Sequence, residues 1–217
     1  MKKNTLLIAA LSVSVALASC AGGGESAEAT SDATNEENTN EVVAETATWT
    51  VDAAKSNIRW TGGTAGATVY SHFGDINVKS GSITTAGEKI TAGNFAVDMT
   101  SIAPKDNGYS EESPMENLVG HLSTPDFFNT AEFPESSFEI TSAEGMKVMG
   151  NLTIRGNSNV ETIEITNMTM NEDGTMTATG TLVFDRQKYD VAWEHFLKDT
   201  VLSDDIKLEI TLVAKKA

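Results

Sequence analysis

The chain contains few side chains of the kinds that perform covalent or metal chemistry. Its three histidines, His72, His121 and His195, lie far apart in the sequence, and none of them begins a metal-binding helix motif. Metal ligands can also come together from distant parts of a chain, so a cluster formed by folding stays open as an alternative. The sequence has no G-x-S-x-G nucleophile elbow and no G-x-x-x-x-G-K-[ST] phosphate loop. We therefore expect no catalytic residue, no metal site, no cofactor and no enzymatic activity.

Cys20 is the only cysteine, which excludes an intramolecular disulfide and a thiolate metal cluster. It follows Lys2, Lys3, an apolar run and the small residues Ala18 and Ser19. This order predicts a secretory signal peptide at residues 1–19. The apolar run is shorter than the roughly 20 residues that a membrane-spanning helix needs.

The segment from Leu17 to Cys20 resembles the bacterial lipoprotein signal. That resemblance implies lipid attachment on the thiol of Cys20, which becomes the mature N-terminus; the alternative is a free thiol beside an ordinary cleavage site. We expect an exported protein that its lipid anchors to a bacterial membrane. Because Ala21 replaces the aspartate that retains some lipoproteins in the inner membrane, we expect the outer membrane, at its periplasmic or surface face.

Residues 20–47 comprise this cysteine and a segment rich in glutamate. The segment has no aromatic residue, no lysine and no arginine, so it cannot bury a core and is expected to be a disordered tether. The whole chain carries 15 Lys and Arg against 31 Asp and Glu, a net charge of −16. Such a surface repels phosphates, so we expect no nucleic-acid partner. The oligomeric state does not follow from these features.

Residues 48–217 have the size of one domain, and their apolar residues alternate with polar ones. Ile206, Leu208 and Ile210 are separated by Lys207 and Glu209, the pattern of a half-buried strand. The same period occurs at 58–60, 76–78, 138–140, 148–154 and 176–184. It changes phase within 90–99 and within 163–170, which predicts a β-bulge or bend in each strand.

Glycine-containing pairs separate these strands and predict turns at Ser80-Gly81, Ala86-Gly87, Glu144-Gly145, 155–157 and 172–174, and also at 62–66. All four prolines fall between residues 104 and 134, which predicts that this stretch lies outside the sheet. Within it, apolar residues follow Pro114 at helical spacing and end at Pro125, which predicts one short helix. The fold class is therefore all-β, an antiparallel sheet of about eight strands with one short helix.

A sheet of about eight antiparallel strands tends to close into a barrel that can hold one small ligand. The alternation alone does not decide between such a cavity and a core filled by side chains. A filled barrel would be a structural or protein-interaction module of the cell envelope. A membrane-spanning barrel would need outward aromatic girdles, whereas the polar phase here carries Arg59, Glu139 and Lys207.

A series of short motifs runs through the whole domain in a characteristic order. They are Trp49-Thr50-Val51-Asp52, Ile58-Arg59-Trp60, Asp98-Met99-Thr100-Ser101-Ile102, Gly120-His121-Leu122, Asp126-Phe127-Phe128, Phe133-Pro134, residues 150–156 and Phe184-Asp185-Arg186. This set resembles the YceI-like family of bacterial lipid-binding proteins. The resemblance implies an extended lipocalin-like β-barrel whose long apolar cavity holds a polyisoprenoid or a similar fatty amphiphile. The polar segment from Lys105 to Glu116 departs from the family pattern and leaves open how the cavity mouth is built.

The candidate ligand contacts are the large apolar residues on the inward phase of the strands. As cavity wall we predict Trp60, Phe95, Phe138, Leu152, Leu182, Phe184 and Leu208. Each could equally be a core residue, since cavities and cores are lined by the same residue types. As cavity mouth or plug we predict Phe127, Phe128, Arg186, Tyr189 and Trp193. For Arg186, an ion pair with Asp185 at a strand end is the alternative to a headgroup contact.

Overall fold

The computed structural model describes residues 44–66, 70–194 and 200–217. These residues form ten β-strands, one α-helix and two 3₁₀ turns. In chain order the elements are β1 (Thr46–Val51), η1 (Ala53–Lys55), β2 (Asn57–Gly66), β3 (Ser71–Ala86), β4 (Lys89–Pro104), α1 (Met115–Ser123), β5 (Glu135–Glu144), β6 (Lys147–Ile154), β7 (Asn157–Met170), β8 (Thr175–Asp185), η2 (Arg186–Tyr189), β9 (Thr200–Leu202) and β10 (Asp205–Lys216).

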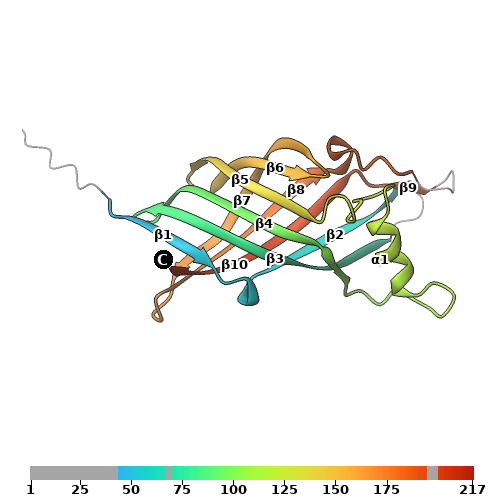
Figure 1. The fold of residues 1–217 in the computed structure, drawn as a ribbon, viewed down its shortest axis with the longest axis horizontal. Coiled ribbons are helices and arrows are strands. Elements are labelled where there is room, and N and C mark those ends of the chain that lie inside the picture. The colour runs from blue at the N-terminus through green and yellow to red at the C-terminus, as the bar shows by residue number, and fades with distance from the viewer. Residues whose placement is uncertain (1–43, 67–69, 195–199) are drawn as a thin grey trace, which may run out of the picture. The chain divides into compact units, whose positions relative to one another are not determined.

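The strands form one antiparallel sheet that closes on itself as a barrel of eight strands (Figure 1). Consecutive strands from β2 to β8 are neighbours, and β8 pairs with β10 along most of its length. Closure comes from pairing between β10 and β2, with Leu208 opposite Trp60. A closed sheet satisfies the backbone groups that an open edge would leave unpaired. The predicted fold class is confirmed.

Strands β1 and β2 follow one another along the same strand position of the barrel. Both β1 and β2 pair with β3 and with β10, and η1 separates them. Ser56 holds this interruption together, because its hydroxyl accepts a hydrogen bond from the Val213 amide (3.0 Å) and donates one to the Asp52 carbonyl (2.8 Å). The barrel already begins at Thr46, two residues inside the segment predicted as tether.

The two predicted irregularities are confirmed as register shifts. Between β3 and β4, Thr84 pairs with Ala92 and Thr85 with Ile90, so Thr91 is the extra residue. Between β7 and β8, the register shifts between Ile165 and Asn167. Each bulge brings the apolar residues on either side of it to the inner face.

Two predicted turns were wrong, because in both places glycine serves close packing within a strand. Ser80 and Gly81 lie inside β3, beside a register shift, and residues 62–66 belong to β2. A Cβ atom on Gly63 would meet the backbone oxygen of Tyr70. The remaining predicted turns are confirmed, and Gly174, between β7 and β8, has a φ of +77° that favours glycine.

The predicted helix is confirmed as α1, which begins after Pro114 and ends before Thr124. It lies in the proline-containing stretch between β4 and β5, at the end of the barrel where β2 ends and β3 begins (Figure 1). Its apolar side packs inward through Leu118 and Leu122. Helix α1 therefore covers part of one barrel end.

Candidate ligand-binding cavity

The inward faces of the strands enclose a cavity of about 290 Å³, near the lower end of ligand-pocket volumes. Its described lining includes all seven residues predicted as cavity wall: Trp60, Phe95, Phe138, Leu152, Leu182, Phe184 and Leu208. The interior is therefore not filled by side chains.

The lining side chains differ from one another in their exposure. Along β10, Ile206, Leu208 and Ile210 point inward but are only half-buried, whereas Leu182 and Phe184 on the neighbouring β8 are buried. These half-buried residues line the cavity and keep part of their surface accessible, so they border its free space. The inward residues of β10 therefore present more accessible surface to the cavity than those of β8.

Glycines on neighbouring strands keep two of the aromatic lining residues close to the wall. Trp60 lies opposite Gly74, and Phe95 lies opposite Gly81. A Cβ atom on Gly74 would come within 2.7 Å of the Trp60 ring, and one on Gly81 within 2.6 Å of the Phe95 ring. With no side chain beneath them, both rings lie over the backbone, and this leaves space in the middle of the barrel.

The described lining is almost wholly apolar and contains no lysine, arginine, aspartate or glutamate. Its polar members include Trp60, Tyr70, His72 and His121, with Ser136, Ser137 and Thr179. A charged group inside this cavity would find no opposite charge among these residues, and burying an unpaired charge is strongly unfavourable.

Aromatic side chains gather beside α1. Phe127 contacts Phe128 and His121, with ring centroids 5.8 and 5.0 Å apart, and the His121 ring contacts Trp193 at 4.7 Å. Phe127, Phe128 and Trp193, three of the five residues predicted as mouth or plug, line the cavity. Sequence reasoning did not single out His121 for this cluster.

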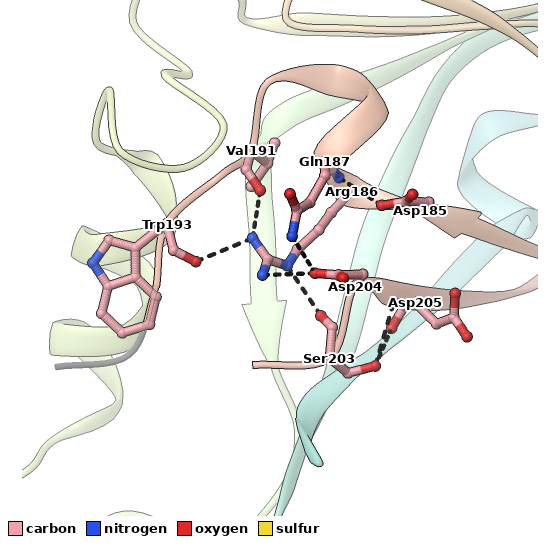
Figure 2. Close-up of polar contacts among 8 residues, drawn as sticks. All are labelled: Asp185, Arg186, Gln187, Val191, Trp193, Ser203, Asp204 and Asp205. Atoms are coloured by element: carbon pink, nitrogen blue, oxygen red, sulfur yellow. Dashed lines mark hydrogen bonds and ion pairs between the residues drawn. The ribbon is translucent and has the colours of Figure 1, made fainter. Parts of the chain in front are cut away.

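Arg186, predicted at the mouth, does not line the cavity; it is 2% exposed and holds together the loop that carries Trp193 (Figure 2). Its guanidinium donates to the backbone carbonyls of Ser203 (3.0 Å), Trp193 (3.1 Å) and Val191, and forms an ion pair with Asp204 (3.0 Å). Burial lowers the pKa of Arg186, opposed mainly by the nearby charge of Asp204. Because it binds these backbone carbonyls, Arg186 is a positioning residue for the loop. The sequence displays its charge but not the carbonyl groups that accept its hydrogen bonds.

Tyr189 also lies outside the lining. It is fully buried, its ring contacts Phe184 (5.4 Å between centroids), and its hydroxyl donates to the Glu161 carboxylate at 3.1 Å. Burial and the neighbouring Glu161 raise the pKa of this hydroxyl. Tyr189 therefore belongs to the packed wall beneath η2.

A polar pocket adjoins the apolar cavity, and Tyr70, His72, Leu118 and His121 line both. In it, His72 Nδ1 lies 2.8 Å from one carboxylate oxygen of Asp106, and the Tyr109 hydroxyl donates to the other at 2.8 Å. Burial opposes the ionisation of Asp106, but the hydrogen bonds from His72 and Tyr109 hold the pKa of its carboxyl below the usual range. The Tyr109 ring also stacks on His72 at 5.5 Å.

This polar pocket explains the unusual segment from Lys105 to Glu116, which supplies Asp106 and Tyr109. Sequence analysis flagged the segment but assigned no contact to it. His72 shares the alternation phase of Ile76 and Val78, and this signal could have placed it on the inner face.

Two residues considered in the sequence, Cys20 and His195, lie outside the described residues. Among the residues that are described, no three His, Cys, Asp or Glu side chains are grouped as a metal site would require. No helix within the described part of the chain is long and apolar enough to cross a membrane.

The barrel closure, the one α-helix of the described residues and the apolar cavity define an antiparallel β-barrel of the lipocalin-like type. The profile of the YceI-like domain family matches residues 49–214, and the chain belongs to that family.

Two solved structures share the fold. BcnA from Burkholderia cenocepacia has a TM-score of 0.59 at 22% identity, covering 76% of this chain and 99% of that one. A polyisoprenoid binding domain from Saccharophagus degradans, implicated in plant cell wall breakdown, has a TM-score of 0.55 at 15% identity, covering 81% and 99%.

Among curated relatives, a UPF0312 protein of Staphylococcus aureus (strain bovine RF122 / ET3-1) is 35% identical over 96 residues. The matching stretch is 41% of this chain and 56% of that relative, so the chain spans about half the length of the curated relatives that it matches.

Proposed function

We propose that the protein binds an apolar lipid, a polyisoprenoid-like amphiphile, in the barrel cavity and sequesters or carries it at the bacterial cell envelope. The observation that carries this proposal is the open apolar cavity, which a barrel with a purely structural role would not need. Membership of the YceI-like family and the fold shared with a polyisoprenoid binding domain support it.

The physical basis is the cost of exposing a lipid tail to water. Each buried CH₂ group contributes about 0.8 kcal/mol, so a tail of several isoprene units is confined to membranes unless a container shields it. The apolar lining supplies such a container. The proposal includes no chemical step on the ligand.

The envelope location is part of the proposal and rests on the sequence before residue 44. We infer that lipid on Cys20 anchors the protein and that the acidic segment after it links anchor and barrel. Anchoring through acyl chains leaves the barrel free of any need for a membrane-binding surface, because two or three chains hold a protein stably by themselves.

Native mass spectrometry of the purified protein tests the proposal. We expect an apolar molecule to co-purify and to be lost when the cavity is filled by Ala178→Trp on β8, where Ala178 is buried and lines the cavity. Ala178→Leu should reduce the bound fraction less, because it fills less space.

Val183→Trp is the matched control, since Val183 lies on the same strand but is 52% exposed. It should keep the bound molecule. A protein that purifies empty and takes up no added lipid would contradict the proposal and favour a structural or protein-interaction module.

A further inference from the structure

The turn between β6 and β7 lies beside two aromatic segments that line the cavity. One follows α1 and carries Phe127 and Phe128, and the other comprises residues 190–194 after η2 and carries Trp193. The Phe127 ring contacts those of Phe128 and Trp193, each with ring centroids 5.8 Å apart. Both segments contact Arg155, the residue that follows β6.

Arg155 binds one backbone carbonyl of each segment. Its guanidinium donates to the Phe127 carbonyl at 2.7 Å and to the Asp190 carbonyl, and it forms an ion pair with the Asp190 carboxylate at 3.5 Å. The Arg155 side chain is 12% exposed, whereas that of Asp190 is 74% exposed. Because an exposed carboxylate adds little to an ion pair, the two carbonyls are the stronger contacts.

The backbone at this contact has an uncommon conformation. Arg155 has a φ of +51° and Asp190 a φ of +60°, in the left-handed region that residues other than glycine seldom adopt. Such conformations persist where the surrounding contacts fix them. Asn157 on β7 adds one such contact, because its side chain donates to the Tyr189 carbonyl at 3.3 Å. Arg155 therefore meets both segments in a fixed geometry.

Arg186 holds the segment that carries Trp193 from another side (Figure 2). It donates to the carbonyls of Val191 and Trp193, and its further contacts are with Ser203 and Asp204. Arg186 thus ties this segment to the residues before β10. Arg155, by contrast, ties it to the segment that carries Phe127.

The opposite end of the barrel, where β1 lies, is packed by side chains (Figure 1). Trp49, Met176 and Ala214 are buried there, and none of the three lines the cavity. The Trp49 indole is fixed by a hydrogen bond that it donates to the Thr85 hydroxyl at 3.1 Å. A lipid would therefore enter and leave at the α1 end, where the two aromatic segments lie.

We propose that Arg155 couples the two aromatic segments into one unit at the mouth of the cavity and thereby sets the rate at which lipid enters and leaves. Because one guanidinium binds both carbonyls, moving either segment alone breaks a charge-assisted hydrogen bond. This inference rests on the proposed function and adds a positioning residue to it. Arg155 itself does not line the cavity, so its loss changes access to the cavity and leaves the walls as they are.

Stopped-flow binding of the fluorescent dye N-phenyl-1-naphthylamine to the purified protein, freed of bound lipid, tests the inference. It gives the association rate, the dissociation rate and Kd. Arg155→Met keeps an unbranched stem but removes the donors. We expect both rates to rise about tenfold, the factor that corresponds to one charge-assisted hydrogen bond, while Kd stays within about twofold. Arg155→Lys keeps the charge and a donor, and it should show a smaller rise in both rates.

Arg59→Met is the matched control, because the Arg59 side chain is 46% exposed and pairs with Asp75 on the neighbouring strand. It should leave both rates unchanged. Unchanged rates in Arg155→Met, or a Kd altered through one rate alone, would overturn the inference while lipid binding stands. If Arg155→Met does not fold, Arg155→Lys decides by the same criteria. If the parent protein binds no dye, the proposed function fails and the inference falls with it.

A double-mutant cycle tests the coupling itself. If Arg155 acts by holding the aromatic segments together, Arg155→Met should accelerate dye exchange less in a Trp193→Leu background than in the parent protein. Full additivity of the two changes in the logarithm of the rates would show that Arg155 does not act through this aromatic cluster.

Discussion

At the scale of single residues, Asp106 fixes how the polar pocket is built. Each of its carboxylate oxygens accepts one hydrogen bond, from His72 on β3 and from Tyr109 five residues before the N-cap of α1. Its side chain is 9% exposed, so these bonds replace most of its hydration. The segment from Lys105 to Glu116 is therefore fastened to the barrel by a charged group.

Replacing this carboxylate by an amide tests the fastening. Asp106→Asn offers one oxygen and one NH₂ group, so one of the two donors loses its acceptor, and we expect the free energy of unfolding at pH 7 to fall by about 1–3 kcal/mol. Chemical denaturation measures the loss. Asp126→Asn, an exposed change beyond α1, should stay within about 0.5 kcal/mol of the parent protein.

The pH dependence of the unfolding free energy tests whether the negative charge of Asp106 stabilises the fold. Because folding lowers the pKa of Asp106, its contribution is complete above its ordinary value of 3.8 and is lost as the pH falls through the folded-state pKa. The stability difference between the parent protein and Asp106→Asn should therefore shrink below about pH 4. A difference that grew on acidification would contradict this account.

At the scale of elements, the spacing of inward glycines controls the free space in the barrel. Gly81 on β3 lets the Phe95 ring of β4 lie flat on the wall, and Gly74 does the same for Trp60 of β2. A strand with larger residues at these positions would turn the rings toward the centre. The same alternation of apolar residues could then give a filled core.

Gly81→Ala should push the Phe95 ring into the cavity. Its added Cβ would lie 2.6 Å from that ring, so we expect a loss of about 1–3 kcal/mol in unfolding free energy and weaker binding of a lipid probe. Thermal unfolding and dye binding measure the two effects.

Gly120→Ala is the matched control, because a Cβ at this exposed position of α1 meets nothing within 4 Å and alanine favours helix. It should leave the dye affinity unchanged and raise stability slightly. If Gly81→Ala and Gly120→Ala lost dye affinity equally, Gly81 would not be the residue that keeps the cavity open.

At the scale of the whole molecule, the closed barrel and the proposed lipid anchor have separate tasks. The barrel buries its own backbone polar groups by pairing β10 with β2, so it needs no partner to complete its sheet. The proposed anchoring residue is Cys20, which precedes the described residues in the sequence. The two tasks can therefore be separated by one substitution.

Cys20→Ser removes the thiol that the lipid would occupy. We expect the variant to move from the membrane fraction to the soluble exported fraction, while its barrel still displays the parent affinity for dye. Cell fractionation and mass analysis of the N-terminal peptide measure this. A Cys20→Ser protein that stays with the membrane would show that something other than lipid on Cys20 holds it there.

The sequence by itself determined the strands, the helix and the identity of the inward face. Period-two alternation fixes which side chains share a face of a strand, and so residues as distant as Trp60 and Leu208 could be predicted to face the same interior. Proline marked the helix start at Pro114, because the first turn of a helix does not need the backbone N–H that proline lacks. The family resemblance rested on short motifs along the whole domain.

Only the tertiary structure decided whether that interior is open and what surrounds it. A cavity and a filled core have the same alternation, and the difference lies in which residue faces which across strands, as with Phe95 over Gly81. Arg186 contacts backbone carbonyls up to 17 residues away, and His72 meets Asp106 across 34 residues. Such contacts depend on where folding brings the backbone, which the order of residues along the chain does not display.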